Sequence, residues 1–193
     1  MAVKVSRFLT HIKRLREPEE PVHRFLGRIE GLGAKLGPVL LQLPPQFRAD
    51  AARLEATLEL FPGSIRVAVE FRHRSWFVDP VRRVLERHGA ALCLADGPRS
   101  RGPRWRTADW TYVRFHQGRA NPPPCYGSTA LATWARRLAT EWGPAAEIWV
   151  YFNNDPRGCA PRNAAQFAGL CRRAGLDPTR VPPVRSVPVR TGT

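Results

Sequence analysis

Six short apolar runs rich in β-branched residues alternate along the chain with longer amphipathic segments, and this alternation most constrains the fold. The runs are typical of buried strands and cover residues 2–6, 38–43, 65–71, 90–95, 111–116 and 147–152. The segments between them have helical periodicity and cover residues 21–36, 49–60, 80–88, 131–141 and 163–174. Strand–helix alternation of this kind predicts an α/β fold with a parallel sheet.

The chain is long enough to bury one sizeable core, since 43% of its 193 residues are hydrophobic. We assign residues 1–176 to a single α/β domain. From residue 177 onward the chain repeats Pro, Val and Arg without periodicity. This composition predicts that residues 177–193 form a disordered tail.

Basic side chains outnumber acidic ones by 31 to 16, which gives a net charge of +15. Most of the basic residues are arginines, whose planar fork suits phosphate and carboxylate groups. The excess favours an anionic partner such as nucleic acid. Codon bias in a GC-rich genome is the alternative explanation, because Arg, Ala, Gly and Pro are all plentiful.

The four cysteines, Cys93, Cys125, Cys159 and Cys171, show neither metal-ligand nor CxxC spacing. We therefore expect reduced thiols and a cytoplasmic protein. The sequence shows no signal peptide and no apolar run of about 18 residues, so no membrane segment is expected.

Polar side chains stand at or near the carboxyl end of every predicted strand. Side chains alternate between faces along a strand, so Glu70 and Arg72 share the face opposite Val69 and Phe71. The same rule places further polar residues at the other strand ends, namely Lys4, Gln42, Asp96, Arg114, His116 and Asn153. This edge is where parallel α/β proteins build their sites. A structural ion pair of Glu70 with Arg72 or Arg114 is the alternative interpretation.

Six successive motifs resemble the signatures of the YecE-like family, a domain of unknown function (DUF72). They are "VKVSRFLTHIKRL", "LGPVLLQLPPQF", "RVAVEFRHRSWF", "LCLAD", "WTYVRFH" and "VYFNND", in that order between residues 2 and 176. The resemblance implies a TIM-type (β/α)8 barrel and leaves the biochemical activity open.

The chain departs from the family pattern at two places. It begins just before what would be the third strand, so we expect an incomplete barrel of about six strands out of eight. The open sheet edges would favour aggregation or oligomerisation, and a misassigned start codon or a truncated gene would explain the difference. The sequence also has His116-Gln117-Gly118 where relatives have His-Gly, so no residue of this loop is carried over.

A phosphate-bearing ligand fits the predicted mouth of the barrel, because barrels often bind phosphate at the loops after the last two strands. The candidates for positioning such an anion are Arg72, Arg114, Asn153, Asn154 and Arg157. The turn after residues 147–152 could instead only cap the last helix.

Three further residues are candidates for proton chemistry at the same edge, namely Glu70, Asp96 and His116. The predicted substrate-binding set also includes Lys4, Gln42, His73 and Trp76. His11 could reach this site or cap the segment that follows it. A divalent metal stays open, although the nearby arginines would repel a cation, and no metal ligand or cofactor is assigned.

We therefore expect a protein that binds or hydrolyses a phosphate-containing substrate, either a nucleotide or nucleic acid. A non-catalytic nucleic-acid-binding or scaffold module is one alternative. A carbohydrate or small-metabolite enzyme is the other, since Glu70 and Asp96 could serve a glycosidase. Whether the protein is an enzyme is left open.

Overall fold

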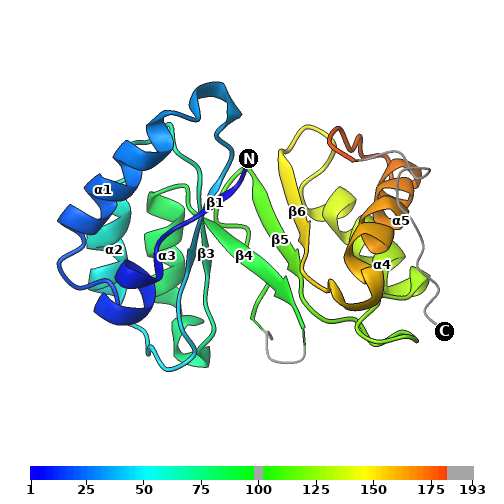
Figure 1. Cartoon of the computed structure of the whole chain (residues 1–193), viewed down its shortest axis with the longest axis horizontal. Helices are drawn as coiled ribbons and strands as arrows, with labels where there is room; N and C mark the ends of the chain where they lie inside the picture. Colours follow the sequence, from blue (N-terminus) through cyan, green and yellow to red (C-terminus); the bar gives the residue numbers. More distant parts are fainter. Residues whose placement is uncertain (98–101, 182–193) are drawn as a thin grey trace. The chain divides into compact units, whose positions relative to one another are not determined.

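A computed structural model describes residues 1–97 and 102–181 of the chain (Figure 1). The strands are β1 (Val3–Lys4), β2 (Val39–Gln42), β3 (Val67–Glu70), β4 (Ala91–Asp96), β5 (Thr111–Phe115) and β6 (Ile148–Phe152). The α-helices are α1 (Glu19–Glu30), α2 (Ala51–Glu59), α3 (Asp79–Arg87), α4 (Ser128–Glu141) and α5 (Cys159–Arg173). Short helical turns are η1 (Phe8–Lys13), η2 (Gly33–Lys35), η3 (Arg74–Trp76) and η4 (Pro156–Gly158).

The six strands form one sheet in chain order, from β1 to β6. The pairs β1–β2, β2–β3 and β3–β4 are parallel, as the strand–helix alternation predicts. The register aligns Gln42 of β2 with Glu70 of β3. These two residues therefore meet at the carboxyl ends of neighbouring strands, side by side.

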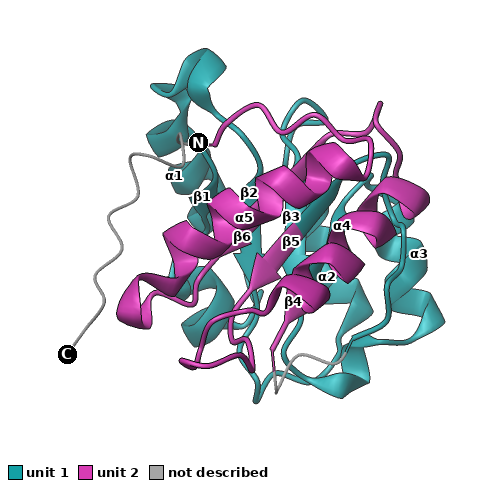
Figure 2. Ribbon diagram, turned by 90° about the vertical axis from the view of Figure 1, so that its right-hand side faces the viewer, with its two compact units in different colours: residues 1–94, 102–112 teal, residues 95–101, 113–193 magenta. Residues whose placement is uncertain are grey.

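The chain divides into two compact units (Figure 2). Unit 1 comprises residues 1–94 and 102–112, and unit 2 comprises residues 95–101 and 113–193. Strands β1 to β3 and helices α1 to α3 belong to unit 1, whereas α4, β6 and α5 belong to unit 2.

The core of unit 1 lies between its strands and its three α-helices, which stand along one side of the strands (Figure 1). Val67, Val69 and Phe71 enter this core from β3 and its carboxyl end, as the alternation of faces predicts. Each is at most 5% exposed. Burial of such side chains stabilises a fold by about 1.5–3 kcal/mol each, so this face of the strand is fixed against the helices.

The core of unit 2 is built on one aromatic residue of β5. The ring of Phe115, which is 0% exposed, contacts the rings of Tyr126, Trp134, Phe152 and Phe167. Helices α4 and α5 pack on each other, and α5 packs on β6. The side of β5 that bears Phe115 is thereby turned toward these helices.

Some element bounds differ from the prediction. The helix expected over residues 21–36 ends at Glu30, because two glycines follow and Gly33 adopts a left-handed φ of +46°. The strand expected over residues 2–6 is reduced to Val3–Lys4. The turn η1 that follows it was not predicted.

Most of the predicted tail, residues 182–193, lies outside the described residues. Among the helices of residues 1–97 and 102–181, none combines the length and the apolar character that crossing a membrane requires.

Candidate functional site

A buried carboxylate marks the carboxyl ends of β2 and β3 in unit 1. Glu70 is 1% exposed, yet both of its carboxylate oxygens accept hydrogen bonds. The side-chain amide of Gln42 donates to Oε2 at 3.0 Å, and Nε of Arg72 donates to Oε1 at 3.0 Å. The fold therefore brings together three of the residues that the sequence singled out, and buried charge is compensated as it must be.

Arg72 contacts the buried carboxylate with one part of its side chain and solvent with the other. Its Nε atom is fixed to Glu70, while its side chain remains 38% exposed. Within residues 1–97 and 102–181, Glu70 is the only hydrogen-bond partner of this guanidinium. The two terminal nitrogens can therefore donate to a ligand that approaches from solvent.

Arg72 is one of three basic side chains that act electrostatically on His11. Burial lowers the pKa of His11, and the positive charges of Arg7, Arg72 and Lys4 lower it further. Nδ1 of His11 lies 2.8 Å from the hydroxyl oxygen of Thr10. We call Lys4, Arg7, His11 and Arg72 the basic group. Arg7 was not among the predicted site residues, because it follows the end of the strand predicted over residues 2–6.

Lys4 and Arg7 are exposed, and their side chains contact no acceptor in the described part of the chain. Positive charges that are close enough to lower the pKa of His11 favour an anion beside it. The basic group is therefore an electropositive surface beside the buried carboxylate.

His73 and Trp76 have structural contacts instead. Nδ1 of His73 accepts from the amide of Ser75 at 3.2 Å and so caps the turn η3. Trp76 is 0% exposed, stacks on Phe71 with 4.8 Å between ring centroids, and donates from its indole to the carbonyl of Phe47. Trp76 belongs to the predicted substrate-binding set, but in the structure its ring is enclosed in the core.

A second polar set lies on β5 and β6 in unit 2. Nε of Arg114 donates to Oδ1 of Asn153 at 3.0 Å. The rings of Trp149 and Tyr151, from the same face of β6, stand parallel with 6.5 Å between centroids. The predicted grouping of Arg114 with Asn153 is therefore present within this unit.

Asp96 and His116 lie at the ends of β4 and β5. The amide of His116 donates to the carbonyl of Asp96 at 2.8 Å, so the two strand ends are joined through the backbone. The carboxylate of Asp96 accepts from the indole of Trp134 on α4 at 3.0 Å. One carboxylate oxygen of Asp96 is therefore engaged with α4, and its catalytic role stays a prediction.

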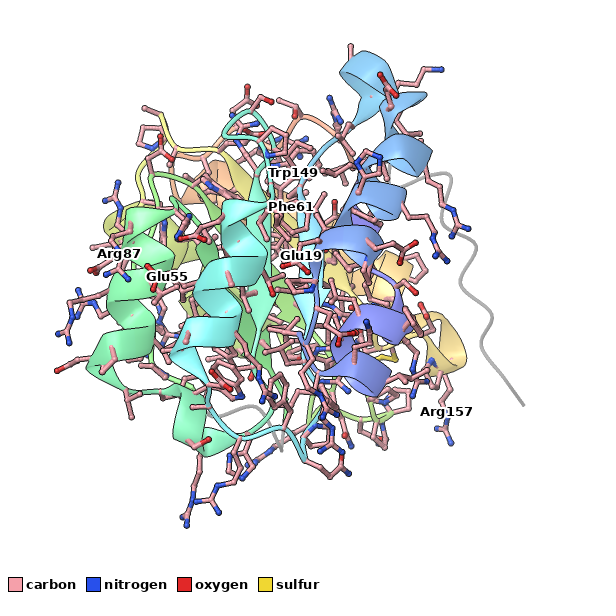
Figure 3. The ribbon with its side chains drawn as sticks, turned by 90° about the vertical axis from the view of Figure 1, so that its left-hand side faces the viewer. Glu19, Glu55, Phe61, Arg87, Trp149 and Arg157 are labelled. Atoms are coloured by element: carbon pink, nitrogen blue, oxygen red, sulfur yellow. A yellow bond between two sulfur atoms is a disulfide. The ribbon has the colours of Figure 1, made fainter. Side chains whose placement is uncertain are left out.

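Asn154 and Arg157 follow β6. Asn154 is 0% exposed, and its amide nitrogen donates to the carbonyl of Pro124 and to Oδ1 of Asn163. This nitrogen is committed to the protein, which leaves it unable to bind an anion as predicted. Arg157 is exposed in η4 (Figure 3).

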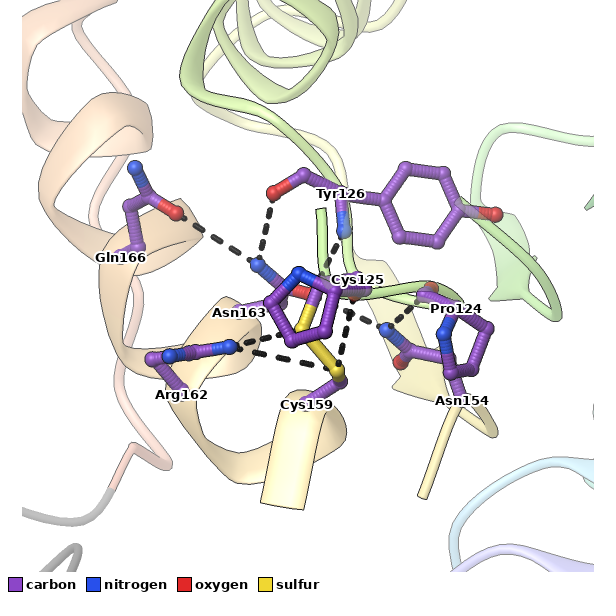
Figure 4. Close-up of a disulfide and its surroundings, with 9 residues drawn as sticks. Pro124, Cys125, Tyr126, Asn154, Cys159, Arg162, Asn163 and Gln166 are labelled. Carbon is purple, nitrogen blue, oxygen red and sulfur yellow. Dashed lines mark hydrogen bonds between the residues drawn. A yellow bond between two sulfur atoms is a disulfide. The ribbon is translucent and has the colours of Figure 1, made fainter. Parts of the chain in front are cut away.

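The expectation of reduced thiols is wrong for one pair. Cys125 and Cys159 form a disulfide with 5.0 Å between their Cα atoms (Figure 4). The two residues are 34 positions apart, and no local spacing reveals the pairing, because the fold alone brings the 117–127 loop to the start of α5. Cys93 and Cys171 are buried and lie outside this disulfide.

One group among the described residues has metal-ligand chemistry, and it lies on the outer helices of unit 1. Glu55 and Glu59 of α2 and His88 after α3 place their ligand atoms within 4.8 Å of one another. Arg87 already forms an ion pair with Glu55 (Figure 3). The predicted carboxylates Glu70 and Asp96 do not belong to this group.

The chain is similar over residues 1–186 to a family described as "Protein of unknown function DUF72". A crystal structure of a DUF72 family protein from Thermotoga maritima is 30% identical and matches with a TM-score of 0.78 over 89% of this chain and 73% of that one. A DUF72 family protein from Enterococcus faecalis is 21% identical, with a TM-score of 0.71 over 93% and 77% of the two chains.

No curated protein matches the sequence. The structural matches confirm the predicted fold class, an α/β fold of the TIM-barrel type with six strands in the described residues. They also confirm the family resemblance that the six motifs indicated.

Proposed function

The chain belongs to the DUF72 family, and we propose that it binds a phosphate-bearing ligand at the carboxyl ends of β1 to β3. One observation supports this above the others. The guanidinium of Arg72 is positioned by a buried carboxylate, and its terminal nitrogens have no acceptor in the described residues.

Arginine presents several N–H donors in a planar fork that matches a phosphate group. With Nε held by Glu70, the outer edge of the fork is pre-organised, so less conformational entropy is lost on binding. Lys4 and Arg7 would add long-range attraction and further donors. Phosphate is favoured over a neutral sugar because Lys4, Arg7 and Arg72 bring three permanent positive charges to the basic group.

Glu70 is a positioning residue in this proposal. Both of its oxygens already accept hydrogen bonds, and it is 1% exposed, so it has no free lone pair directed at solvent to act as a base. Gln42 holds the carboxylate on its other side. The site is therefore proposed to bind, and hydrolysis would need a further group.

Thermal unfolding tests the proposal. A ligand that binds only the native state stabilises it by RT ln(1 + [L]/Kd), about 2.7 kcal/mol at a hundredfold excess over Kd. We expect inorganic phosphate or a nucleotide to raise the Tm, and Arg72→Gln to abolish this rise. The matched control is Arg82→Gln, which removes an exposed arginine of α3 that pairs with Glu86.

The net charge of +15 supports a second candidate, a nucleic-acid-binding module that uses surface arginines without a defined site. In that case Arg72→Gln and Arg82→Gln would weaken oligonucleotide binding equally. Each would reduce the slope of log K against log salt by about one unit or less. An Arg72-specific loss supports the site; equal losses contradict it.

A further inference from the structure

The 117–127 loop of unit 2 is fastened to the start of α5 by several contacts. The Cys125–Cys159 disulfide is the covalent one (Figure 4). The side chain of Asn163 accepts from the amide of Tyr126 at 2.9 Å and donates to its carbonyl at 3.0 Å. The loop also closes on itself, because the amide of Gly118 donates to the carbonyl of Pro124.

A guanidinium lies directly against the disulfide. Nη2 of Arg162 is 2.7 Å from Sγ of Cys125 and 4.0 Å from Sγ of Cys159. In the described part of the chain these sulfurs are its only hydrogen-bond partners. A disulfide sulfur is a weak, uncharged acceptor, whereas a thiolate would form an ion pair with the guanidinium. Arg162 is therefore better matched to the reduced state of Cys125 than to the oxidised one.

The second cysteine is also placed where a thiolate is stabilised. Cys159 is the first residue of α5, a helix of 15 residues, and the positive end of the helix dipole lies there. Cys171, near the end of the same helix, is the internal contrast. Burial raises the pKa of Cys171 to about 11, as is typical of an inert structural thiol.

We propose that Cys125 and Cys159 are a reversible redox pair, a thiol–disulfide exchange site whose co-reactant is a dithiol. Stabilising the reduced form makes a disulfide easier to reduce. This distinguishes the pair from a structural disulfide, which resists reduction by thiols.

Reduction of the disulfide takes two exchange steps. A thiolate of the dithiol attacks the sulfur of Cys159, the Cys125–Cys159 bond breaks, and Cys125 leaves as a thiolate beside Arg162. The second thiol of the dithiol then displaces Cys159 from the mixed disulfide. The dithiol becomes a cyclic disulfide, two electrons pass to the protein, and the two protons of the dithiol are available to the cysteines.

Both sulfurs are buried, since Cys125 is 3% exposed and Cys159 is 0% exposed. Exchange therefore requires the 117–127 loop to lift from α5. Once the bond is broken, only noncovalent contacts hold the loop, and it should open more often.

The redox state of the pair would change the hydrogen bonds at the ends of β4 and β5. The hydroxyl of Tyr126, next to Cys125, donates to the carbonyl of Asp96 at 3.0 Å and accepts from the amide of Gln117 at 3.1 Å. Burial raises the pKa of Tyr126, and the charge of Asp96 raises it further, so the hydroxyl keeps its proton. Loosening the loop would loosen this bridge as well.

A redox titration of the full chain tests the proposal. The protein is equilibrated with glutathione buffers of increasing reducing strength, alkylated, and analysed by mass spectrometry of the Cys125 and Cys159 peptides. We expect the folded protein to be reduced by excess glutathione. Arg162→Met should make the disulfide at least tenfold harder to reduce, which corresponds to about 30 mV.

Two control variants are matched to this one. Arg172→Met removes an exposed arginine from the last turn of the same helix, and Cys171→Ser removes an unrelated thiol. Both should titrate like the wild type. A wild-type disulfide that resists glutathione, or an Arg162→Met midpoint within twofold of the wild type, would overturn the proposal.

A second variant covers the case in which Arg162→Met does not fold. Cys159→Ser leaves the thiol of Cys125 beside Arg162, and its alkylation rate should show a midpoint below the ordinary thiol pKa of about 8.5. A midpoint at or above that value contradicts the proposal. Hydrogen exchange at the amides of Gly118 and Ala120 should be faster in the reduced protein; equal rates would contradict the loosening of the loop.

Discussion

Single side chains at the strand ends of unit 1 divide into those that face the protein and those that face solvent. Gln42 donates a hydrogen bond to Glu70 in the interior, and Arg72 extends from Glu70 to the surface. The same alternation of faces that buries Val69 and Phe71 on one side places these polar groups on the other. Two experiments at this scale separate a positioning role from direct ligand contact.

The change Glu70→Gln should lower the free energy of unfolding without abolishing phosphate binding. The new amide oxygen can still accept from Arg72, but the charge-assisted bonds are lost. We expect a cost of about 1–2 kcal/mol, less than for a fully buried ion pair because the freed charge of Arg72 is hydrated. Urea unfolding and phosphate titration measure both effects. A stable variant that no longer binds phosphate would show that Glu70 contacts the ligand itself.

His11 should report on the anion through its protonation. Its pKa lies below the ordinary 6.5 because burial and then the charges of Arg7, Arg72 and Lys4 disfavour the imidazolium. Bound phosphate offsets those charges, so adding phosphate should raise the pKa of His11. NMR titration of the imidazole, assigned with His11→Gln, measures this. An unchanged pKa at saturating phosphate would place the anion elsewhere.

The same shift sets how His11 affects stability. As the pH falls below 6.5, the unfolded chain takes up a proton at this residue before the folded one does. Protonation of His11 therefore lowers the free energy of unfolding as the pH falls from 6.5 to the lowered pKa, and above pH 6.5 it costs no stability. Phosphate should narrow the pH range over which stability changes, since it moves the pKa of His11 in the folded protein back toward its value in the unfolded chain.

At the scale of elements, the 117–127 loop depends on one close backbone approach. A Cβ atom on Gly118 would lie 2.0 Å from the carbonyl oxygen of Cys125 and 2.6 Å from the amide of Tyr126. Both obstacles are backbone, which cannot rotate away as a side chain can. The glycine is required here by space rather than by its dihedral angles.

Gly118→Ala should therefore destabilise the protein and reduce the yield of the Cys125–Cys159 disulfide. Forcing atoms into a closed backbone contact costs about 1–3 kcal/mol or more. Gly127→Ala is the control, because its Cβ would meet only Ala120 at 3.7 Å and its φ is −77°. Gly127 is the N-cap of α4, where Ala is less favourable than Gly, so we expect a cost of at most about 1 kcal/mol. Thermal melts measure the stability of both variants, and thiol counting measures their disulfide content. Equal stability would mean that the loop can pack on α5 without the close backbone contact at Gly118.

At the scale of the whole molecule, two compact units each have a hydrophobic core, and the candidate residues divide between them. Unit 1 contains Glu70 and the basic group, whereas unit 2 contains Arg114, Asn153 and the disulfide. The proposals for the two units are therefore independent, and each can fail without the other. The net charge of +15 is that of the whole chain and favours anionic partners in general.

The sequence by itself determined the order of strands and helices, the fold class and the family. Periodicity is a local property, so the face of β3 that bears Val67, Val69 and Phe71 could be predicted from spacing alone. The grouping of Gln42, Glu70 and Arg72 followed from the rule that parallel strands end at one edge. Gly33, with its left-handed φ, ended a predicted helix early.

Only the tertiary structure decided which polar side chains are available to a ligand. Trp76, Asp96 and Asn154 looked equivalent to Arg72 in the sequence. In the structure the indole of Trp76 donates to a core carbonyl, one carboxylate oxygen of Asp96 accepts from an indole, and the amide nitrogen of Asn154 donates to a neighbouring loop. The disulfide was equally hidden, because two cysteines 34 residues apart meet only when a loop and a helix pack together. Hydrogen bonds and disulfides join residues that are distant in sequence, and no local pattern specifies the partner.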